Sequence, residues 1–297
     1  MAESARPMRR SVLLLGTLVE IAAEAPSRSI LEDAFVAACV ELVRIHRRLS
    51  GHDRASELSR VNALAASEPQ PISDDLRRVL SCALDIAERS RGAFDPTVGA
   101  QVAALGFLPL QAAAPGRASW RDVELTGQTV RYAKPLVLDF GGIAKGYAVD
   151  CAIEALRANG ASAGRVNAGG DLRVFGARSE PVHIRTGGPQ GAVFPLVHLA
   201  EGAVATSAYG GQRRRRDRRW ASPLVDPRLR LPVLSTRTAS VIAPTCMVAD
   251  ALTKVVVLLG RGARGVLRAY GADAVVLSPA RGRWRCTRLD GTMVAAA

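Results

Sequence analysis

The sequence is poor in aromatic residues and has no hydrophobic run long enough to cross a bilayer. Aromatic side chains make up 4% of the 297 residues, which leaves few flat surfaces on which the bases of single-stranded nucleic acid could stack. A membrane-spanning helix needs about 18 or more consecutive apolar residues, and no segment approaches that length. We therefore expect no membrane span, and no nucleic acid as the main partner.

The cysteines are few and follow neither a metal-binding nor a disulfide pattern. They are odd in number, scattered, and form no CxxC motif; the five are Cys39, Cys82, Cys151, Cys246 and Cys286. Such spacing is typical of reduced, mostly buried thiols and indicates a reducing compartment.

The N-terminal segment resembles a secretory signal only in part. Arg9 and Arg10 precede the apolar run "SVLLLGTLV", but this run is short and Glu20 interrupts its continuation. The alternation of Val19 and Ile21 indicates a strand instead. We expect a cytoplasmic protein, with a cleaved signal peptide as the less favoured alternative.

What the sequence has in excess is positive charge. The formal net charge is +13 at pH 7, which favours anionic partners such as phosphorylated ligands. The densest run is "RRRRDRR" at residues 213–219, which is either a solvated loop or a contact surface for an anion. With 48% hydrophobic and 23% charged residues, the chain has the material for a buried core, and disorder is excluded.

Helical and strand patterns alternate along the chain without an internal repeat. Ser29 and Glu32 stand at capping-box spacing before a helical pattern that ends at Gly51. A second helix should run from Ser73 to Gly92, with a polar turn at "SELSRVN" between the two helices. Short β-like runs then alternate with turns, and helices are expected again at 144–159 and 245–260. We predict an α+β fold with mixed or antiparallel sheets and packed helices, in which residues 1–297 form one domain, in one or two lobes.

The stretch "DFGGIAKGYAVD" at residues 139–150 joins an apolar run to a predicted helix. Its glycines, Gly141, Gly142 and Gly146, miss the spacings of the Walker loop and of the dinucleotide fingerprint, and a Gly-Gly pair is a common way to turn a chain. Yet such a loop also offers backbone N–H groups at a helix N-terminus, which attract anions, and Lys145 adds a positive charge. By itself the stretch fits either a turn or an anion-binding loop.

Other polar strings recur along the chain: "GAFDPTVGA" at 92–100, "NAGGDLRVFG" at 167–176, "VATSAYGG" at 204–211, "LVDPR" at 224–228 and "APTCMVADALTK" at 243–254. Each could be a simple turn, but in this order and spacing they resemble the FAD:protein FMN transferase family, the ApbE-like flavin transferases. The resemblance runs from "LLLGTLVEI" to the helix after Asp250. It implies an ApbE-like (T-fold-like) architecture and an enzyme that moves FMN from FAD, through its phosphate, onto a Thr or Ser hydroxyl of a target flavoprotein, with Mg²⁺ assisting and AMP leaving.

The resemblance also implies roles for individual positions. At the FAD it places Leu15, Ala93, Phe94, Asp95, Asp139, Lys145 and Val225. At the Mg²⁺ it places the carbonyl of Gly142 and the catalytic carboxylate of Asp250, with Thr253 and Lys254 at the positions that complete the site. A hard divalent cation held by a few protein oxygens and by the substrate's phosphates is the usual device in phosphoryl transfer. The simplest alternative is that Asp250 only pairs with Lys254, one turn away.

Two positions depart from the family pattern. Pro223 stands where many members have a histidine that is often proposed to assist the reaction, and Lys254 stands where they have a threonine. An ammonium has no lone pair for a metal, so either Lys254 replaces part of the metal's charge or the metal binds beside it more weakly. We expect the second, because a single positive charge cannot bridge several phosphate oxygens as Mg²⁺ does.

No catalytic base is assigned from the sequence. The histidines show no metal-ligand spacing and are expected to be ordinary surface or core residues; they are His46, His52, His183 and His198. The two departures leave open a flavin carrier or an FAD pyrophosphatase that has lost protein transfer. The net charge leaves open, with less support, a basic nucleic-acid-binding protein. The acceptor protein and the oligomeric state stay unassigned.

Overall fold

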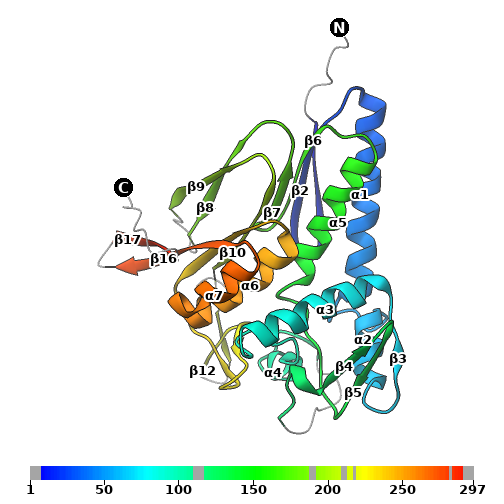
Figure 1. The fold of residues 1–297 in the computed structure, drawn as a ribbon, viewed down its shortest axis with the longest axis vertical. Coiled ribbons are helices and arrows are strands. Elements are labelled where there is room, and N and C mark those ends of the chain that lie inside the picture. The colour runs from blue at the N-terminus through cyan, green and yellow to red at the C-terminus, as the bar shows by residue number, and fades with distance from the viewer. Residues whose placement is uncertain are drawn as a thin grey trace.

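The computed structural model describes residues 8–109, 117–186, 192–208, 213–216, 219–280 and 283–289. Its centre is an eight-stranded sheet (Figure 1) with the strand order β1-β2-β6-β7-β10-β15-β16-β17. These strands are β1 (Met8–Leu14), β2 (Thr17–Glu24), β6 (Ala163–Ala168), β7 (Asp171–Phe175), β10 (Gly202–Ala208), β15 (Thr238–Ala243), β16 (Asp273–Ala280) and β17 (Arg283–Arg288). Every neighbouring pair is antiparallel, so the predicted α+β class with antiparallel sheet is confirmed.

The two faces of this sheet are covered by different elements. Successive strand residues point to opposite faces, and one face carries Ile21, Val166 and Ala205, which belong to the main hydrophobic core. On this face lie the helices α1 (Arg28–Leu49), α5 (Ala144–Ala158) and α6 (Cys246–Leu259). The other face carries Leu172 and Val204, which pack under the hairpin of β8 (Glu180–Arg185) and β9 (Val193–Leu199).

The same alternation places polar side chains of the sheet against the helices. Asp171 of β7 forms an ion pair with Lys145 of α5, and Ser207 of β10 bonds the hydroxyl of Thr253 in α6 at 2.7 Å. Because each polar group finds its partner across the interface, it avoids the cost of burial without a hydrogen bond. These pairs fix the positions of both helices relative to the strands.

The helix boundaries follow the predicted ones with two corrections. The predicted capping pair of α1 is wrong: Ser27, not Ser29, accepts a hydrogen bond from the backbone N–H of Ile30 (3.3 Å), and Glu32 pairs with Arg28 instead. The predicted polar turn "SELSRVN" is also wrong, since it forms the helix α2 (Glu57–Leu64). Helix α3 (Asp74–Arg89) begins directly after Ser73, as predicted, and ends before the predicted Gly92. Helices α5 and α6 lie where helical patterns were predicted.

A smaller layer lies at one end of the helices. It contains α2, α3, α4 (Gly99–Ala104) and a three-stranded sheet of β3 (Gln70–Pro71), β5 (Thr129–Tyr132) and β4 (Val123–Thr126) (Figure 1). Leu58 and Tyr132 of this layer belong to the same hydrophobic core as Phe35 of α1. The main sheet and the smaller layer therefore share one hydrophobic core.

Short elements complete the described chain. They are the 3-10 turns 120–122 and 260–263, the pairs β11 (Arg214–Arg216) with β12 (Arg219–Ala221) and β13 (Val225–Asp226) with β14 (Leu231–Pro232), and the helix α7 (Arg264–Ala269). Within the described residues, no helix is both long enough and apolar enough to span a bilayer.

The start of α6 lies directly against Gly146 of α5. A Cβ atom at Gly146 would lie 2.3 Å from the carbonyl oxygen of Cys246 and 2.8 Å from the Cα of Met247, and neither backbone atom can swing away. We expect Gly146→Ala to lower the free energy of unfolding by about 1–3 kcal/mol, measured by urea denaturation. Gly265→Ala in α7 is the matched control, because a Cβ there meets nothing within 4 Å; equal losses in both variants would contradict the prediction.

Candidate active site

A cavity of about 300 Å³ lies between the smaller layer, the start of α5 and the body of α6. This volume is in the range of small-molecule sites. Its walls come from the segment before α4, the loop 139–142, the adjoining ends of β7 and β10, the segment 223–227 and one side of α6. Elements far apart in the sequence therefore converge on a single space.

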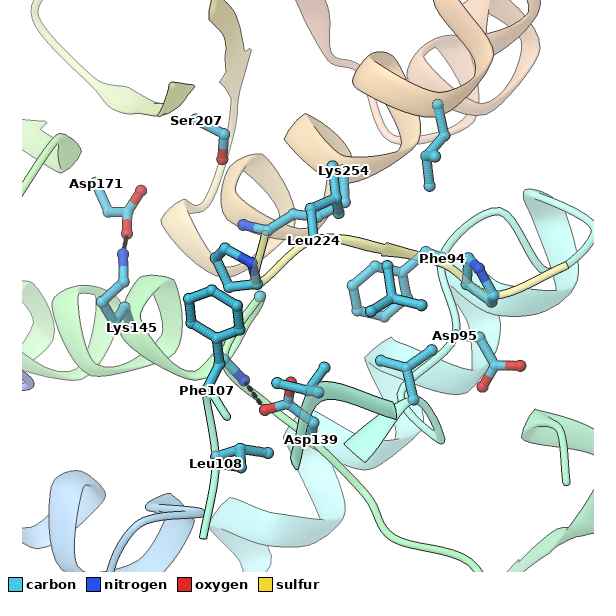
Figure 2. Close-up of a pocket in the computed structure, with 18 of the residues that line it drawn as sticks. Phe94, Asp95, Phe107, Leu108, Asp139, Lys145, Asp171, Ser207, Leu224 and Lys254 are labelled. Carbon is cyan, nitrogen blue, oxygen red and sulfur yellow. Dashed lines mark hydrogen bonds and ion pairs between the residues drawn. The ribbon is translucent and has the colours of Figure 1, made fainter. Parts of the chain in front are cut away.

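The cavity combines apolar and charged side chains (Figure 2). Phe94, Phe107 and Leu224 contribute apolar surface, while the charged groups of Lys145 and Asp171 lie together at one edge of the view, with the hydroxyl of Ser207 near them. A ligand that fills this space should combine a flat or apolar part with an anionic part, because each part would then meet a matching wall.

The loop before α5 both turns the chain and lines the cavity. The backbone N–H of Asp139 donates to the carbonyl of Pro96 (2.7 Å), and Gly141 N–H donates back to the Asp139 carboxylate (2.8 Å). Gly141 and Gly142 then line the cavity, and α5 begins at Ala144 without a capping side chain. Burial raises the pKa of the Asp139 carboxyl, although the Gly141 N–H opposes this shift. The Gly146 N–H in the first turn of α5 already donates to Asp250 (3.3 Å), so an anion in the cavity would meet the positive end of the helix and Lys145.

Two lysines and two aspartates form a compact cluster at the cavity. Lys145 pairs with Asp171, and Lys254 pairs with Asp250. Burial, together with the charge of Asp250, raises the pKa of Asp171 to about 6. Burial alone would lower the pKa of Lys145, but Asp171 and Asp250 outweigh it and raise that pKa. Burial would raise the pKa of Asp250, but the two lysines and the Gly146 N–H outweigh it, so Asp250 is ionised at neutral pH.

The donor groups expected at Mg²⁺ are already engaged within the protein. The Asp250 side chain is 1% exposed, and its Oδ1 pairs with the Lys254 ammonium while its Oδ2 accepts the Gly146 N–H (3.3 Å). The Thr253 hydroxyl donates to the Asp250 carbonyl (2.7 Å) and also contacts a serine hydroxyl. Among the residues described, no cluster of three His, Cys, Asp or Glu side chains could hold a metal. This arrangement does not fit the Mg²⁺ site implied for Gly142, Asp250, Thr253 and Lys254.

Most of the positions expected at FAD line this cavity. They are Ala93, Phe94, Asp95, Asp139, Lys145 and Val225. Leu15 does not line it, because it occupies the turn of the β1–β2 hairpin with a φ of 56°. The Asp95 carboxylate accepts hydrogen bonds from the Thr97 N–H (2.9 Å), the Thr97 hydroxyl (2.7 Å) and the Trp120 N–H (3.2 Å). Asp95 therefore holds the shape of its loop.

Several lining residues were not identified from the sequence. Asp171 follows a Gly-Gly pair, and this pattern predicts a hairpin but no binding role. Phe107 and Leu108 follow α4 and belong to no recognisable motif. His52, expected to be an ordinary histidine, lines the cavity after the end of α1. Pro223, which stands where many family members have a histidine, also lines the cavity.

Comparison with known proteins gives a consistent set of relatives. The sequence model of the ApbE family matches residues 15–276. A protein of Rhodobacter capsulatus named FAD:protein FMN transferase is 31% identical and aligns with 90% of this chain, but the chain spans only 56% of that protein's length. A protein of the same name from Treponema pallidum is 28% identical, with 92% of this chain and 85% of that protein aligned.

Solved structures share the fold over nearly the whole chain. The ApbE protein of Thermotoga maritima has a TM-score of 0.78 and 26% identity, covering 97% of this chain and 96% of that one. The flavinyl transferase ApbE of Pseudomonas stutzeri has a TM-score of 0.81 with the same coverage, and at 23% identity it is similar in fold alone. The predicted ApbE-like architecture is confirmed.

Loss of the Lys145 charge should make stability depend on pH. In Lys145→Met, Asp171 keeps its burial and loses its partner, so its folded-state pKa should rise above about 6. A carboxyl whose folded-state pKa is raised favours the fold when protonated. Wild type and variant should therefore run parallel up to about pH 6, and the free energy of unfolding of the variant should fall relative to wild type as the pH rises from about 6 through the raised pKa, by about 1.4 kcal/mol per unit of added pKa shift.

Urea denaturation at a series of pH values measures this effect. Lys134→Met is the control, since Lys134 is about half exposed and pairs with Asp122 at the surface. Parallel pH profiles for wild type and Lys145→Met would show that Lys145 does not stabilise the charge of Asp171.

Proposed function

The chain belongs to the ApbE family, and from this membership we propose that it is an FAD:protein FMN transferase. In the proposed reaction, the FMN part of FAD moves onto a Thr or Ser hydroxyl of a target flavoprotein, and AMP leaves. The relatives that bear this name support the reaction, and the family match spans the whole set of cavity residues.

The observation that carries the proposal is that one cavity combines apolar side chains with the ion pair of Lys145 and Asp171. FAD has flat aromatic rings and a pyrophosphate, and a cavity with this mixed lining would bind both. Phe94 and Val225 would contact a ring, since buried aromatic and apolar contacts supply most of the affinity in such sites. Gly141, Gly142 and Lys145 would receive phosphate oxygens at the start of α5.

The proposed transfer follows from positioning and charge neutralisation. The acceptor hydroxyl oxygen attacks the phosphorus of the FMN half, the bond to the bridging oxygen breaks, and AMP leaves with that oxygen while the hydroxyl proton is released. Phosphoryl transfer requires chiefly that the attacking and leaving oxygens be held in line and that phosphate charge be neutralised. Lys145 would hold the phosphate, and Asp171 would orient the Lys145 ammonium.

A covalent product tests the proposed reaction. The protein is incubated with FAD and candidate flavoproteins, and acceptors are examined for flavin fluorescence that survives denaturation and for the mass increase of one FMN. AMP release without a labelled acceptor would indicate an FAD pyrophosphatase, and bound flavin without either product would indicate a flavin carrier. Affinity for nucleic acid that falls steeply with salt and is insensitive to FAD would favour the basic nucleic-acid-binding alternative.

Asp139 gives a matched test of the site itself. We expect Asp139→Ala to weaken FAD binding by at least about tenfold, or 1.4 kcal/mol, the low end for loss of a buried charge-assisted hydrogen bond. Isothermal titration measures the affinity, and Asp33→Ala, an exposed aspartate on α1, is the control. Equal affinities in wild type and Asp139→Ala would remove Asp139 from the binding site.

The arginine run borders the proposed site. The Arg214 guanidinium carbon lies 5.4 Å from the ring centroid of Phe107, a cavity residue, and that of Arg213 lies 5.7 Å from Trp220. Residues 217 and 218 of the run lie outside the described residues. Clustered positive charge near the opening would attract an acidic acceptor protein or the leaving AMP.

Neutralising this run should slow modification of the acceptor. With residues 213–216 all changed from Arg to Ser, the rate of acceptor labelling should fall at low salt, while FAD affinity should stay nearly unchanged. The difference from wild type should shrink at high ionic strength, because salt screens such steering. An unaltered labelling rate at low salt would show that the run is only a solvated surface.

A further inference from the structure

Lysine is rare in this chain, and its placement is uneven. The chain has 40 lysines and arginines, of which three are lysine: Lys134, Lys145 and Lys254. Two of the three line the candidate active site. Lysine differs from arginine in offering a compact point charge rather than a planar fork. An otherwise arginine-rich chain thus has compact positive charges where a phosphate group would lie.

The Lys254 side chain is held in place on two sides. Its ammonium pairs with the Asp250 carboxylate and also donates to the Asp250 carbonyl at 3.0 Å. Its methylene stem lies over Gly142: a Cβ added there would come within 2.9 Å of the Lys254 Cε. Glycine at position 142 therefore leaves the space through which Lys254 reaches the cavity (Figure 2).

The ammonium lies between a buried carboxylate and the open cavity. The side chain of Lys254 is 14% exposed, against 1% for Asp250. From this placement we propose that Lys254 is a cation built into the phosphate side of the cavity: its ammonium binds phosphate oxygens of the dinucleotide, in the place where Mg²⁺ was expected. The inference rests on the proposed function, because FAD supplies the phosphates. Asp250 is then a positioning residue for Lys254 and not a metal ligand.

Electrostatics favours the ammonium over a divalent ion at this point. A Mg²⁺ on Asp250 would have to displace Lys254 from the carboxylate, and the displaced ammonium would stay within its reach and repel it. A single positive charge was expected to bind several phosphate oxygens only weakly, and a second cation partly offsets this weakness. Lys145 also lines the cavity, so a second ammonium group is available to the phosphates, although Asp171 and Asp250 offset part of the two positive charges. In this proposal no metal binds beside Lys254, contrary to our expectation from the sequence.

Binding experiments with and without metal separate the two possibilities. FAD affinity is measured by isothermal titration in a chelating buffer and again with MgCl₂, for wild type, Lys254→Met, Lys254→Thr and the control Lys134→Met. Met keeps the stem that packs on Gly142 and removes the charge, while Thr restores the oxygen ligand found in the family pattern. Wild type and Lys134→Met should bind FAD equally well in both buffers, within about twofold.

The two Lys254 variants should respond differently to metal. Lys254→Met should lose about 10- to 100-fold in FAD affinity in both buffers, as expected for a lost charge-assisted contact. Lys254→Thr should show the same loss in chelator and recover at least about tenfold when MgCl₂ is added, because the Asp250 carboxylate is then released for a metal. If Lys254→Met does not fold, the double variant Asp250→Asn/Lys254→Met, which leaves no unpaired buried charge, should show the same metal-independent loss.

The opposite pattern would overturn the inference. If wild type loses at least about tenfold in FAD affinity in chelator while Lys254→Met binds like wild type, a metal and not Lys254 neutralises the phosphates. The proposed function fails separately. Wild type that binds FAD without metal but labels no acceptor would contradict the transfer reaction and leave the role of Lys254 intact.

Discussion

The arrangement of the site depends on a reciprocal contact between α5 and α6. Asp150 of α5 accepts the backbone N–H groups of Cys246 and Met247 at the start of α6, each at 2.8 Å. Asp250 of α6 in turn accepts the N–H of Gly146 in the first turn of α5 (3.3 Å). Each helix thus satisfies the orphan N–H groups of the other with a carboxylate, which the helix dipole favours. Gly146, lacking a side chain, makes the required approach possible.

This contact explains why so many charges can share one small space. Once the two helix starts are joined, Lys145 and Lys254 face the same cavity, and each meets an aspartate that burial alone would neutralise. Asp171 reaches the cluster because its strand passes under α5. Burial raises the energy of each charge, and the neighbouring opposite charges lower it again. A phosphate that enters is therefore met by groups already oriented, with little reorganisation left to make.

Features that depend only on neighbouring residues in the sequence were predicted correctly. The helix starts at Ser73 and Thr245 and the Gly-Gly hairpin of β6 and β7 depend on neighbouring residues, and they were predictable. The partners of Asp171 and the cavity position of His52 depend on which strands and helices meet across the sheet, which no local pattern contains. The resemblance to a family brought most of the lining together. It could not show that Lys254, once folded against Asp250, would take the position of an expected metal.

The packing of α1 against α5 has a consequence for synthesis of the protein. The apolar side of α1 buries Leu31, Phe35 and Leu42, and its main helical partner is α5, which ends at Ala158, whereas α1 ends at Leu49. At about 5–20 residues per second on the ribosome, α1 emerges several seconds before its partner does. During that interval its apolar surface has no native cover, and this exposed surface, not the folded protein, is where chaperones would be needed.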